Sequence, residues 1–148
     1  MDQLDTTIRN FLDRYARITN RALQTPPVID SEDLAAYFAP YFVGSAPQGV
    51  FGSANDANFL TVMEKGFAHY RQIGGKAMTI TDVRVRPLDA VHASAEVDWD
   101  FAYRNSAGTE GNVRFTNIYF VTTAGGQPKI FAYITADEEK AKREHGLV

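Results

Sequence analysis

The sequence contains no cysteine, and it has only three histidines and one tryptophan among its 148 residues. Without cysteine the chain forms no disulfide, holds no metal through thiolates and offers no cysteine nucleophile. The longest nearly apolar run, 35–43, contains Pro40 and is about half the ~20 residues that a membrane-spanning helix needs. The first residues also lack the basic and apolar regions of a signal peptide. We therefore expect a soluble, cytoplasmic protein with no membrane partner.

An excess of positive charge is missing too, since 15 basic side chains stand against 18 acidic ones and the net charge is −3. Nucleic-acid-binding proteins usually present a basic face, and docking on anionic membranes needs clustered lysine and arginine. The basic residues of this chain are dispersed along its length. No nucleic-acid partner is therefore expected.

Several motifs that would announce a cofactor or a nucleophile are absent. The sequence has no glycine-rich phosphate loop, no dinucleotide fingerprint, no serine in a nucleophile elbow and no His, Asp or Glu cluster with metal-ligand spacing. We therefore expect no cofactor and no metal site. What the chain does have is 45% hydrophobic and 12% aromatic residues, which suffice for one sizeable core. With no linker or repeat, residues 1–148 are predicted to form a single domain.

Apolar residues recur at helical spacing in the first half of the chain and predict three helices. The first covers 4–23, and Tyr15 lies in the middle of its apolar stripe. The second is short, begins near Ser31 and ends at Pro40. The third covers about 55–73, and its apolar face is Phe59, Val62, Met63, Gly66, Phe67, Tyr70 and Ile73.

The hydrophobic period then changes to two and predicts strands at 77–86, 90–104, 112–122 and 129–135. The segment 41–51 is interrupted by glycine and proline and indicates a short strand and a loop. Short connections make neighbouring strands antiparallel. Helices followed by a meander predict an α+β fold, in which three N-terminal helices pack on a curved antiparallel sheet.

The last segment, 137–148, is predicted to be a solvated helix and tail. Thr135 and Glu138 have the spacing of a capping box, and Glu138 and Lys142 form an i,i+4 pair.

The strands differ in how their apolar residues are distributed between the two faces. Strand 90–104 has Trp99 and Phe101 on an apolar face and Asp98 and Asp100 on a polar one. The last two strands are apolar on both faces. In 112–122, Tyr119 points to one face and Ile118 and Phe120 to the other. In 129–135, Phe131 and Tyr133 point to one face, and the residues of the other face are Ile130, Ala132 and Ile134. Strands of that kind are normally buried on both sides, yet one layer of helices covers only one. We therefore expect a homodimer through the sheet.

Several short features recur in one known family: Arg14-Tyr15 followed by Asn20, Tyr37-Phe38-Ala39, Gly52 before the third helix, Val97-Asp98-Trp99, the run 115–120 and Lys129-Ile130. With this element order, the chain resembles the nuclear transport factor 2-like superfamily, the cone-shaped α+β fold of ketosteroid isomerase, scytalone dehydratase and polyketide cyclases. The resemblance covers nearly the whole chain. It implies a pocket between the helices and the concave sheet, and a dimer through the convex sheet.

The resemblance also implies roles for particular positions. Tyr15 occupies the place of the oxyanion-hole tyrosine of ketosteroid isomerase. The catalytic base of that enzyme falls on Val43 or Gly44 here, and its protonated aspartate falls at or beside Ile118, where Asn117 is the adjacent residue, so two of its three catalytic groups are missing. Scytalone dehydratase uses histidine and aspartate pairs, and His69 has no evident partner of this kind. Steroid isomerisation is therefore not expected.

The candidate catalytic residues are Tyr15, His69, Asp98 and Asp100. The Tyr15 hydroxyl either donates to a bound carbonyl or bonds within the core. His69 is either a general base at the pocket rim or a boundary histidine bonded to a neighbour. The two aspartates either face the cone, where desolvation and mutual repulsion raise one pKa, or form cross-strand ion pairs on the outer face, Asp100 with Arg114.

The candidate ligand-binding residues are the large apolar side chains of the strands: Trp99, Phe101, Ile118, Phe120, Phe131 and Tyr133. As a set they predict a small apolar or aromatic ligand, with ordinary packing as the alternative for each. Two functions follow. The first is a cone-fold protein that binds such a molecule, with or without cofactor-free isomerase, dehydratase or cyclase activity. The second is a non-catalytic homodimeric association module whose cone is filled by side chains. An open cavity with converging polar groups would distinguish the first from the second.

Overall fold

The computed structural model describes residues 3–148, which form four helices and six strands. In chain order they are α1 (Gln3–Arg21), α2 (Ser31–Ala35), β1 (Phe38–Ala46), β2 (Gly49–Ala54), α3 (Ala57–Gln72), β3 (Gly75–Pro87), β4 (His92–Arg104), β5 (Glu110–Thr122), β6 (Lys129–Ile134) and α4 (Glu138–Glu144). One curved sheet contains all the strands in the order β2-β1-β6-β5-β4-β3, antiparallel except where β1 meets β6. The predicted α+β cone fold is confirmed.

The principal difference from the prediction lies in the segment between α2 and α3. It forms a two-stranded hairpin, β1 and β2, in place of one short strand and a loop. The short helix ends at Ala35, so Phe38 begins β1 and Pro40 lies inside that strand instead of ending the helix. Proline is tolerated there because the pairing of β1 with β6 is irregular between Phe38 and Val43, and no ladder hydrogen bond is lost.

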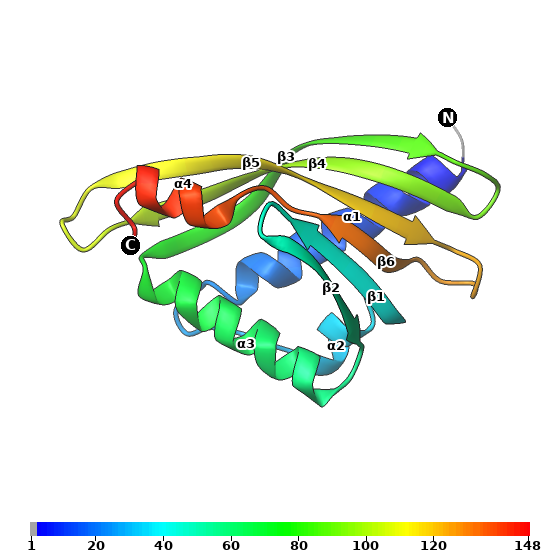
Figure 1. Cartoon of the computed structure of the whole chain (residues 1–148), viewed down its shortest axis with the longest axis horizontal. Coiled ribbons are helices and arrows are strands. Elements are labelled where there is room, and N and C mark those ends of the chain that lie inside the picture. The colour runs from blue at the N-terminus through cyan, green and yellow to red at the C-terminus, as the bar shows by residue number, and fades with distance from the viewer. Residues whose placement is uncertain (1–2) are drawn as a thin grey trace.

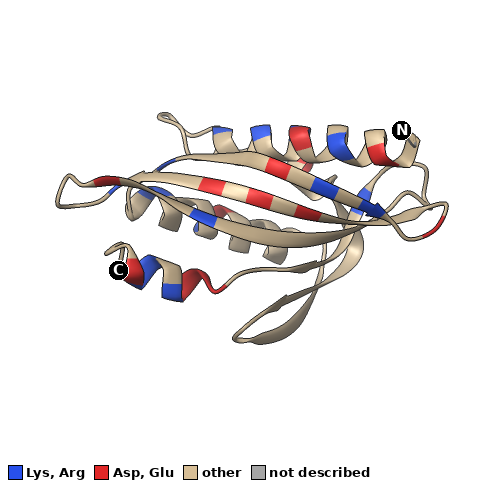
Figure 2. Ribbon diagram, turned by 90° about the horizontal axis from the view of Figure 1, so that it is seen from above, with Lys and Arg blue, Asp and Glu red and all other residues tan. Residues whose placement is uncertain are grey.

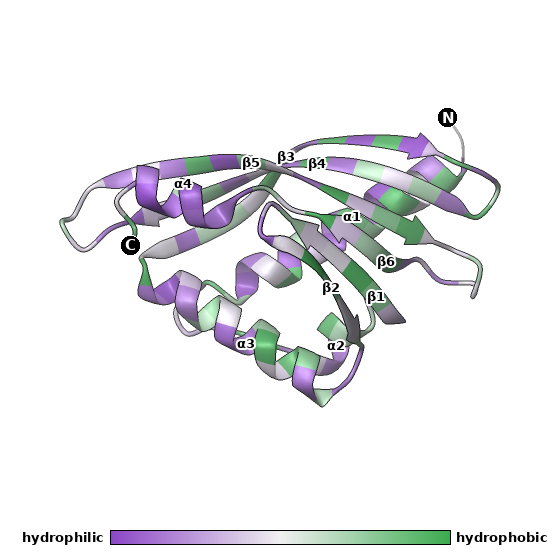
Figure 3. Ribbon diagram, in the orientation of Figure 1, coloured by the Kyte–Doolittle hydropathy of each residue, from purple (hydrophilic) through white to green (hydrophobic). Residues whose placement is uncertain are grey.

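The apolar stripe of α1 packs on the concave face of the sheet as predicted, and its buried residues are Ile8, Phe11, Leu12, Ile18 and Thr19. Figure 1 shows α1 and α3 on the same side of the curved sheet, and Figure 3 shows hydrophobic and hydrophilic residues alternating along both helices. Polar contacts fix the position of α1. Asn20 Oδ1 accepts a hydrogen bond of 3.0 Å from the Met78 amide, and Arg9 Nη1 donates one of 2.7 Å to the Val83 carbonyl. No helix among residues 3–148 is long and apolar enough to cross a membrane.

The helix α3 covers the open side of the cone. Its cap is Asp56, whose carboxylate accepts from the Phe59 amide at 3.1 Å. Phe59 and Phe67 are buried as predicted, whereas Val62 is 66% exposed, so its assignment to the buried face was wrong. The helix stands away from the sheet near Val62, and that separation leaves a cavity beneath it.

The C-terminal segment closes one end of the cone. The cap of α4 is Asp137, which accepts from the Lys140 amide at 3.1 Å, so the predicted capping box beginning at Thr135 was wrong. Lys142 and Leu147 are buried, so one side of α4 packs against the protein, while Glu139, Lys140, Arg143 and Glu144 are exposed to solvent. Figure 1 shows it beside the sheet at the end away from the N-terminus.

Alternation along β4 is as predicted, with Trp99 and Phe101 inside and Asp98 and Asp100 outside. Along β6 it is broken by a bulge. Phe120 pairs with Ala132 and Val121 with Ile130, so Phe131 is an extra residue in β6. Ile130 and Tyr133 consequently face the cone together, while Ala132 and Ile134 face outward with Phe131. Strict alternation had placed Ile130 and Tyr133 on opposite faces.

Candidate functional site

A cavity of about 450 Å³ lies between α1, α3 and the concave face of the sheet. Its wall is formed by Tyr15, Thr19, Phe38, Phe51, Gly52, Ser53, Asn58, Phe59, Val62, Met63, Gly66, Phe67, Tyr70, Met78, Trp99, Phe115, Asn117, Tyr119, Tyr133, Thr135 and Glu138. The volume falls within the ~300–1,000 Å³ typical of small-molecule sites. The cone is therefore open, in contrast to the filled cone of a pure association module.

Tyr15 reaches the cavity from the middle of α1. Its ring makes edge contacts with Trp99 and Tyr119, with centroids 6.3 and 6.0 Å apart. Among residues 3–148 its hydroxyl has no hydrogen-bond partner, and no buried side-chain oxygen or nitrogen is left without one. The two observations agree because the hydroxyl is accessible from the cavity. Of the two readings of this residue, a free donor fits better than a core hydroxyl bonded to the protein.

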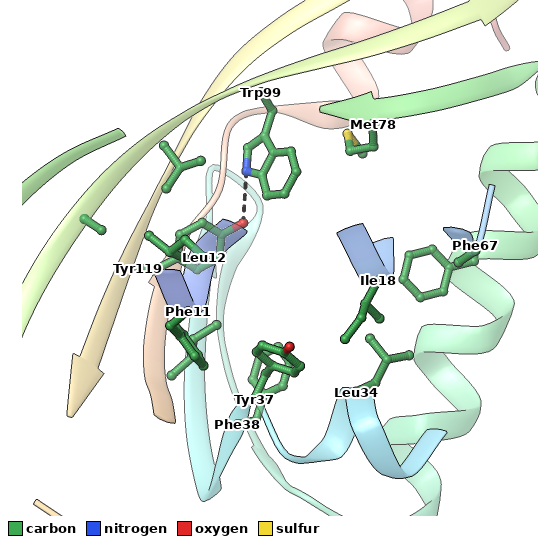
Figure 4. Packing of buried hydrophobic residues seen from close by; sticks show 14 of the residues in the cluster. Phe11, Leu12, Ile18, Leu34, Tyr37, Phe38, Phe67, Met78, Trp99 and Tyr119 are labelled. Atoms are coloured by element: carbon green, nitrogen blue, oxygen red, sulfur yellow. Dashed lines mark hydrogen bonds between the residues drawn. The ribbon is translucent and has the colours of Figure 1, made fainter. Parts of the chain in front are cut away.

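Tyr119 lies beside Tyr15 and belongs to a small hydrogen-bond network. Its hydroxyl oxygen accepts from Trp99 Nε1 at 3.1 Å, the bond drawn in Figure 4, and from Asn117 Nδ2 at 3.3 Å. Asn117 is itself held by the Ala136 amide, which donates to its Oδ1 at 3.4 Å. Two donors on one hydroxyl oxygen polarise the O–H bond, so Tyr119 becomes a stronger donor toward the cavity.

A carboxylate lines the same cavity at the end closed by α4. The Tyr70 hydroxyl donates to Glu138, with both carboxylate oxygens 2.9 Å away. A second, smaller cavity of about 40 Å³ lies beyond this pair, and Tyr70, Met78, Phe115 and Glu138 line both spaces. The Tyr70–Glu138 contact therefore forms part of the partition between them.

The four cavity tyrosines all have raised pKa values. Burial raises the pKa of Tyr119 and of Tyr133 to about 12. Burial, reinforced by neighbouring tyrosines, raises the pKa of Tyr15 well above its usual value. Burial and then the Glu138 carboxylate do the same for the pKa of Tyr70. At neutral pH these side chains are thus uncharged hydroxyls that donate hydrogen bonds.

The mouth of the cavity lies between β2 and α3. Phe51, which is 51% exposed, stacks edge-on against Tyr133 with centroids 6.0 Å apart, and the 66% exposed Val62 on α3 also lines the cavity. Gly44 makes room for this contact, because a Cβ on it would collide with both aromatic rings. The hairpin missed by the sequence analysis therefore supplies one side of the entrance.

Two predicted catalytic positions do not meet at this cavity. Asp98 and Asp100 lie on the outer face of the sheet. Asp98 accepts from Arg84 at 2.9 and 3.0 Å and from Thr116 at 2.7 Å, and these bonds, the arginine's above all, lower its pKa to about 2. Asp100 accepts from Asn112 at 2.8 Å and lies 3.7 Å from Arg114, the cross-strand pairing that the hairpin register predicted. Both therefore act as ion-pair partners away from the cavity.

His69 is the third predicted position outside the cavity. It lies at the edge of α3, half-buried, with its ring 6.4 Å from that of Tyr70, and it does not line either cavity.

The six predicted ligand-binding residues divide into three groups. Trp99 and Tyr133 line the main cavity. Phe101 lines the small one. Ile118, Phe120 and Phe131 lie on the outer face, which corrects the expectation that all six share one pocket. Ile118 and Phe120 pair with the outward-facing Glu96 and Ser94, and the bulge turns Phe131 toward Phe120 and His92.

Several polar residues of the cavity were missed by the sequence analysis, and Asn117 and Glu138 are the two that join its hydrogen-bond networks. Asn117 alternates with Phe115 and Tyr119 on the inward face of β5, and a buried amide among aromatic residues was a usable signal. Glu138 looked like an ordinary helix-terminal acid, and only the packing of α4 brings it to the cavity. Among residues 3–148 no group of three or more His, Asp or Glu side chains is placed to hold a metal.

Comparison with known proteins places this geometry in a family. A family model described as NTF2-like protein (DUF6841) matches residues 3–138. No curated protein matches the sequence.

Solved structures share the fold at low sequence identity. An NTF-2-like protein of unknown function from Shewanella oneidensis has a TM-score of 0.64 at 12% identity, over 90% of this chain and 98% of its own. A protein of unknown function with a cystatin-like fold from Nostoc punctiforme has 0.59 at 13%, over 92% of each. A ketosteroid isomerase-like protein from Erwinia carotovora atroseptica has 0.57 at 13%, over 90% and 92%. At these identities the likeness shows the fold alone.

Proposed function

The chain belongs to the NTF2-like protein family DUF6841, and from this fold and its open cavity we propose that it binds a small, largely apolar molecule between the helices and the sheet. The observation that carries the proposal is the Tyr15 hydroxyl, which reaches the cavity and has no protein partner among residues 3–148. A hydroxyl that opens on an apolar cavity is free to donate a hydrogen bond, and a ligand oxygen would supply the acceptor.

The polar groups of the cavity also suit proton transfer without a cofactor. Tyr15 and Tyr119 would donate to a ligand carbonyl or hydroxyl and stabilise negative charge that develops on it. Glu138, at the end of the same cavity closed by α4, would accept or return a proton. The fold is shared with a ketosteroid isomerase-like protein and with a protein described as a scytalone dehydratase from Novosphingobium aromaticivorans. We therefore propose isomerisation, dehydration or cyclisation as the class of reaction. Tyr15 keeps the role of hydrogen-bond donor that the sequence suggested, and Glu138 replaces His69, Asp98 and Asp100 as the group that moves the proton.

The test uses the single tryptophan of the chain as a reporter, because Trp99 lines the cavity. We expect adamantanone, a compact apolar ketone, to change Trp99 fluorescence in a saturable way. Tyr15→Phe should bind it about tenfold more weakly, as loss of one hydrogen bond of ~1.4 kcal/mol implies. Its thermal stability should remain unchanged, because no protein group loses a partner.

Tyr41→Phe is the matched control, since Tyr41 lies on β1 with 61% of its surface exposed and does not line the cavity. Unaltered ketone affinity in Tyr15→Phe, or no response of Trp99 to the ketone, would contradict the proposal.

A second proposed function, homodimerisation, rests on the outer face of the sheet. Over β3 and β4 this face carries charged residues that are paired with one another, Arg84 with Asp82, Glu96 and Asp98 (Figure 2). Over β2, β1, β6 and the second half of β5 it carries apolar residues instead: Val50, Tyr41, Val43, Ile134, Phe131, Ile118 and Phe120. We propose that a second copy covers this apolar half, because a two-fold axis brings the same patch of two copies together.

A further inference from the structure

The charges around the cavity are unevenly distributed. Among the residues that line it in the described chain, Glu138 is the one with a formal charge, and no lysine, arginine or histidine joins it. Nearly half of the lining residues are aromatic. A ligand that enters therefore meets one carboxylate, several neutral hydroxyls and the faces and edges of aromatic rings.

The Glu138 carboxylate has no cationic partner within ion-pair distance among residues 3–148. The basic group on the same helix that packs inward is Lys142, and its Nζ lies 3.2 Å from Glu139. Lys142 lines the small cavity and not the large one, with Nζ 5.7 Å from the centroid of the Tyr70 ring. Glu138 accepts a hydrogen bond from Tyr70, but no positive charge in the main cavity balances it.

From these observations we infer that the cavity selects an organic cation, a protonated or quaternary amine on an apolar body, over neutral and anionic molecules of the same shape. A carboxylate facing a space of low dielectric constant attracts a cation and repels an anion more strongly than it would in water. Aromatic faces add a cation–π attraction, and aromatic cages are the usual receptors for quaternary ammonium groups. The inference rests on the proposed binding function and specifies the chemical class of the ligand.

The arrangement also orients such a ligand. The ammonium group would lie against Glu138 and Tyr70 at the end closed by α4. The apolar body would fill the space beside Trp99, and an oxygen, where the ligand has one, would face Tyr15. A ligand carboxylate or phosphate would place a second negative charge near Glu138, and no lysine, arginine or histidine of the cavity wall would neutralise it. We therefore expect anionic ligands to be excluded.

The experiment compares three molecules with one body: adamantylammonium, adamantanol and adamantanecarboxylate at neutral pH. Each is titrated against Trp99 fluorescence. We expect the ammonium ion to bind at least about tenfold more tightly than the alcohol, and the carboxylate to bind most weakly. In Glu138→Gln, which retains an acceptor for Tyr70, the ammonium affinity should fall about tenfold while that of the alcohol stays the same. Glu144→Gln removes the same charge from α4 outside the cavity and should change neither.

The outcomes separate the two claims. If adamantanol binds as tightly as adamantylammonium, the inference is wrong and the proposed binding of apolar molecules stands. If Glu138→Gln weakens both probes equally while its circular dichroism is native, Glu138 only shapes the cavity, and the inference is again wrong. If neither these probes nor adamantanone affects Trp99, the proposed function fails and the inference falls with it.

Discussion

The rings of Tyr15 and Tyr119 meet edge to face with centroids 6.0 Å apart, but their hydroxyls differ in their hydrogen-bond partners. Tyr15 has no hydrogen-bond partner among residues 3–148, whereas Tyr119 accepts from Trp99 and Asn117. Removing the Tyr119 oxygen leaves two buried donors without an acceptor. We expect Tyr119→Phe to lower the free energy of unfolding by about 1–3 kcal/mol, measured by urea denaturation.

Tyr15→Phe is the control for that measurement, since it deletes the same atom from a neighbouring tyrosine ring and should leave the unfolding free energy within ~0.5 kcal/mol of the original. Equal losses in the two variants would mean that the Tyr15 hydroxyl also has a structural role, and would count against its function as a free donor.

For single residues, the sequence analysis predicted which side chains face inward better than it predicted which polar groups lie beside them in the cavity. Helical spacing placed Tyr15 in the core stripe, and strand alternation placed Trp99 inside. Glu138 was beyond its reach, because the packing of α4 against α3 brings a helix-terminal carboxylate to the cavity. The orientations of Ile118 and Phe120 were predicted correctly relative to Tyr119, but which face lines the cone depends on the register with β4.

Among the elements, the turn from α3 into β3 joins the helix to the sheet and depends on Gly74. Gly74 has a φ of +100°, and the Arg104 carbonyl oxygen occupies the place where a Cβ would lie. The Gly74 carbonyl in turn accepts from the Arg104 amide at 2.9 Å, which fastens the turn to β4. We expect Gly74→Ala to destabilise the protein by more than about 1 kcal/mol in thermal or urea unfolding.

Gly66 provides the matched substitution on the same helix. It lies inside α3 on the cavity wall, and a Cβ there meets no atom within 4 Å. Gly66→Ala should therefore stabilise the protein by about 0.5–1 kcal/mol. If Gly74→Ala unfolds with the same free energy as the original protein, the turn can adjust to a Cβ, and the position of α3 over the cavity would then not depend on Gly74.

The hairpin and the bulge show what periodicity could not predict at the level of elements. Glycine and proline in 41–51 marked an irregular segment, yet both strands form because Gly49, with a φ of +141°, allows the tight reversal between them. The bulge in β6 cannot be recognised from the sequence, because 129–135 has the same pattern of apolar residues as a regular strand. Both features shape the cavity, so the architecture was more predictable than the site.

For the whole molecule, the outer face of the sheet is the surface on which the proposed dimer depends. Strands apolar on both faces predicted a covered second face, and in the monomer the apolar half of that face, defined above, is uncovered. In the charged half, Arg84 pairs with Asp98 and Arg114 pairs with Asp100 across the strands. A second copy rotated about a two-fold axis would bury the apolar half and leave the ion pairs at the rim, as in other protein interfaces.

Ile134 is the residue at which to test this association. It is 43% exposed and lies between Ser45 on β1 and Ile118 on β5, near the middle of the apolar half. We expect the native chain to sediment as a dimer and Ile134→Glu to sediment as a monomer at the same concentration, because the interface would bury two unpaired carboxylates. Leu88→Glu makes the same kind of change in the β3–β4 turn, where the side chain is 53% exposed, and should remain dimeric. A monomeric native chain, or a dimeric Ile134→Glu variant, would exclude this face as the interface.

Since the cavity opens on the opposite side, between β2 and α3, dissociation by Ile134→Glu should leave adamantanone binding intact, so assembly and ligand binding can be measured independently.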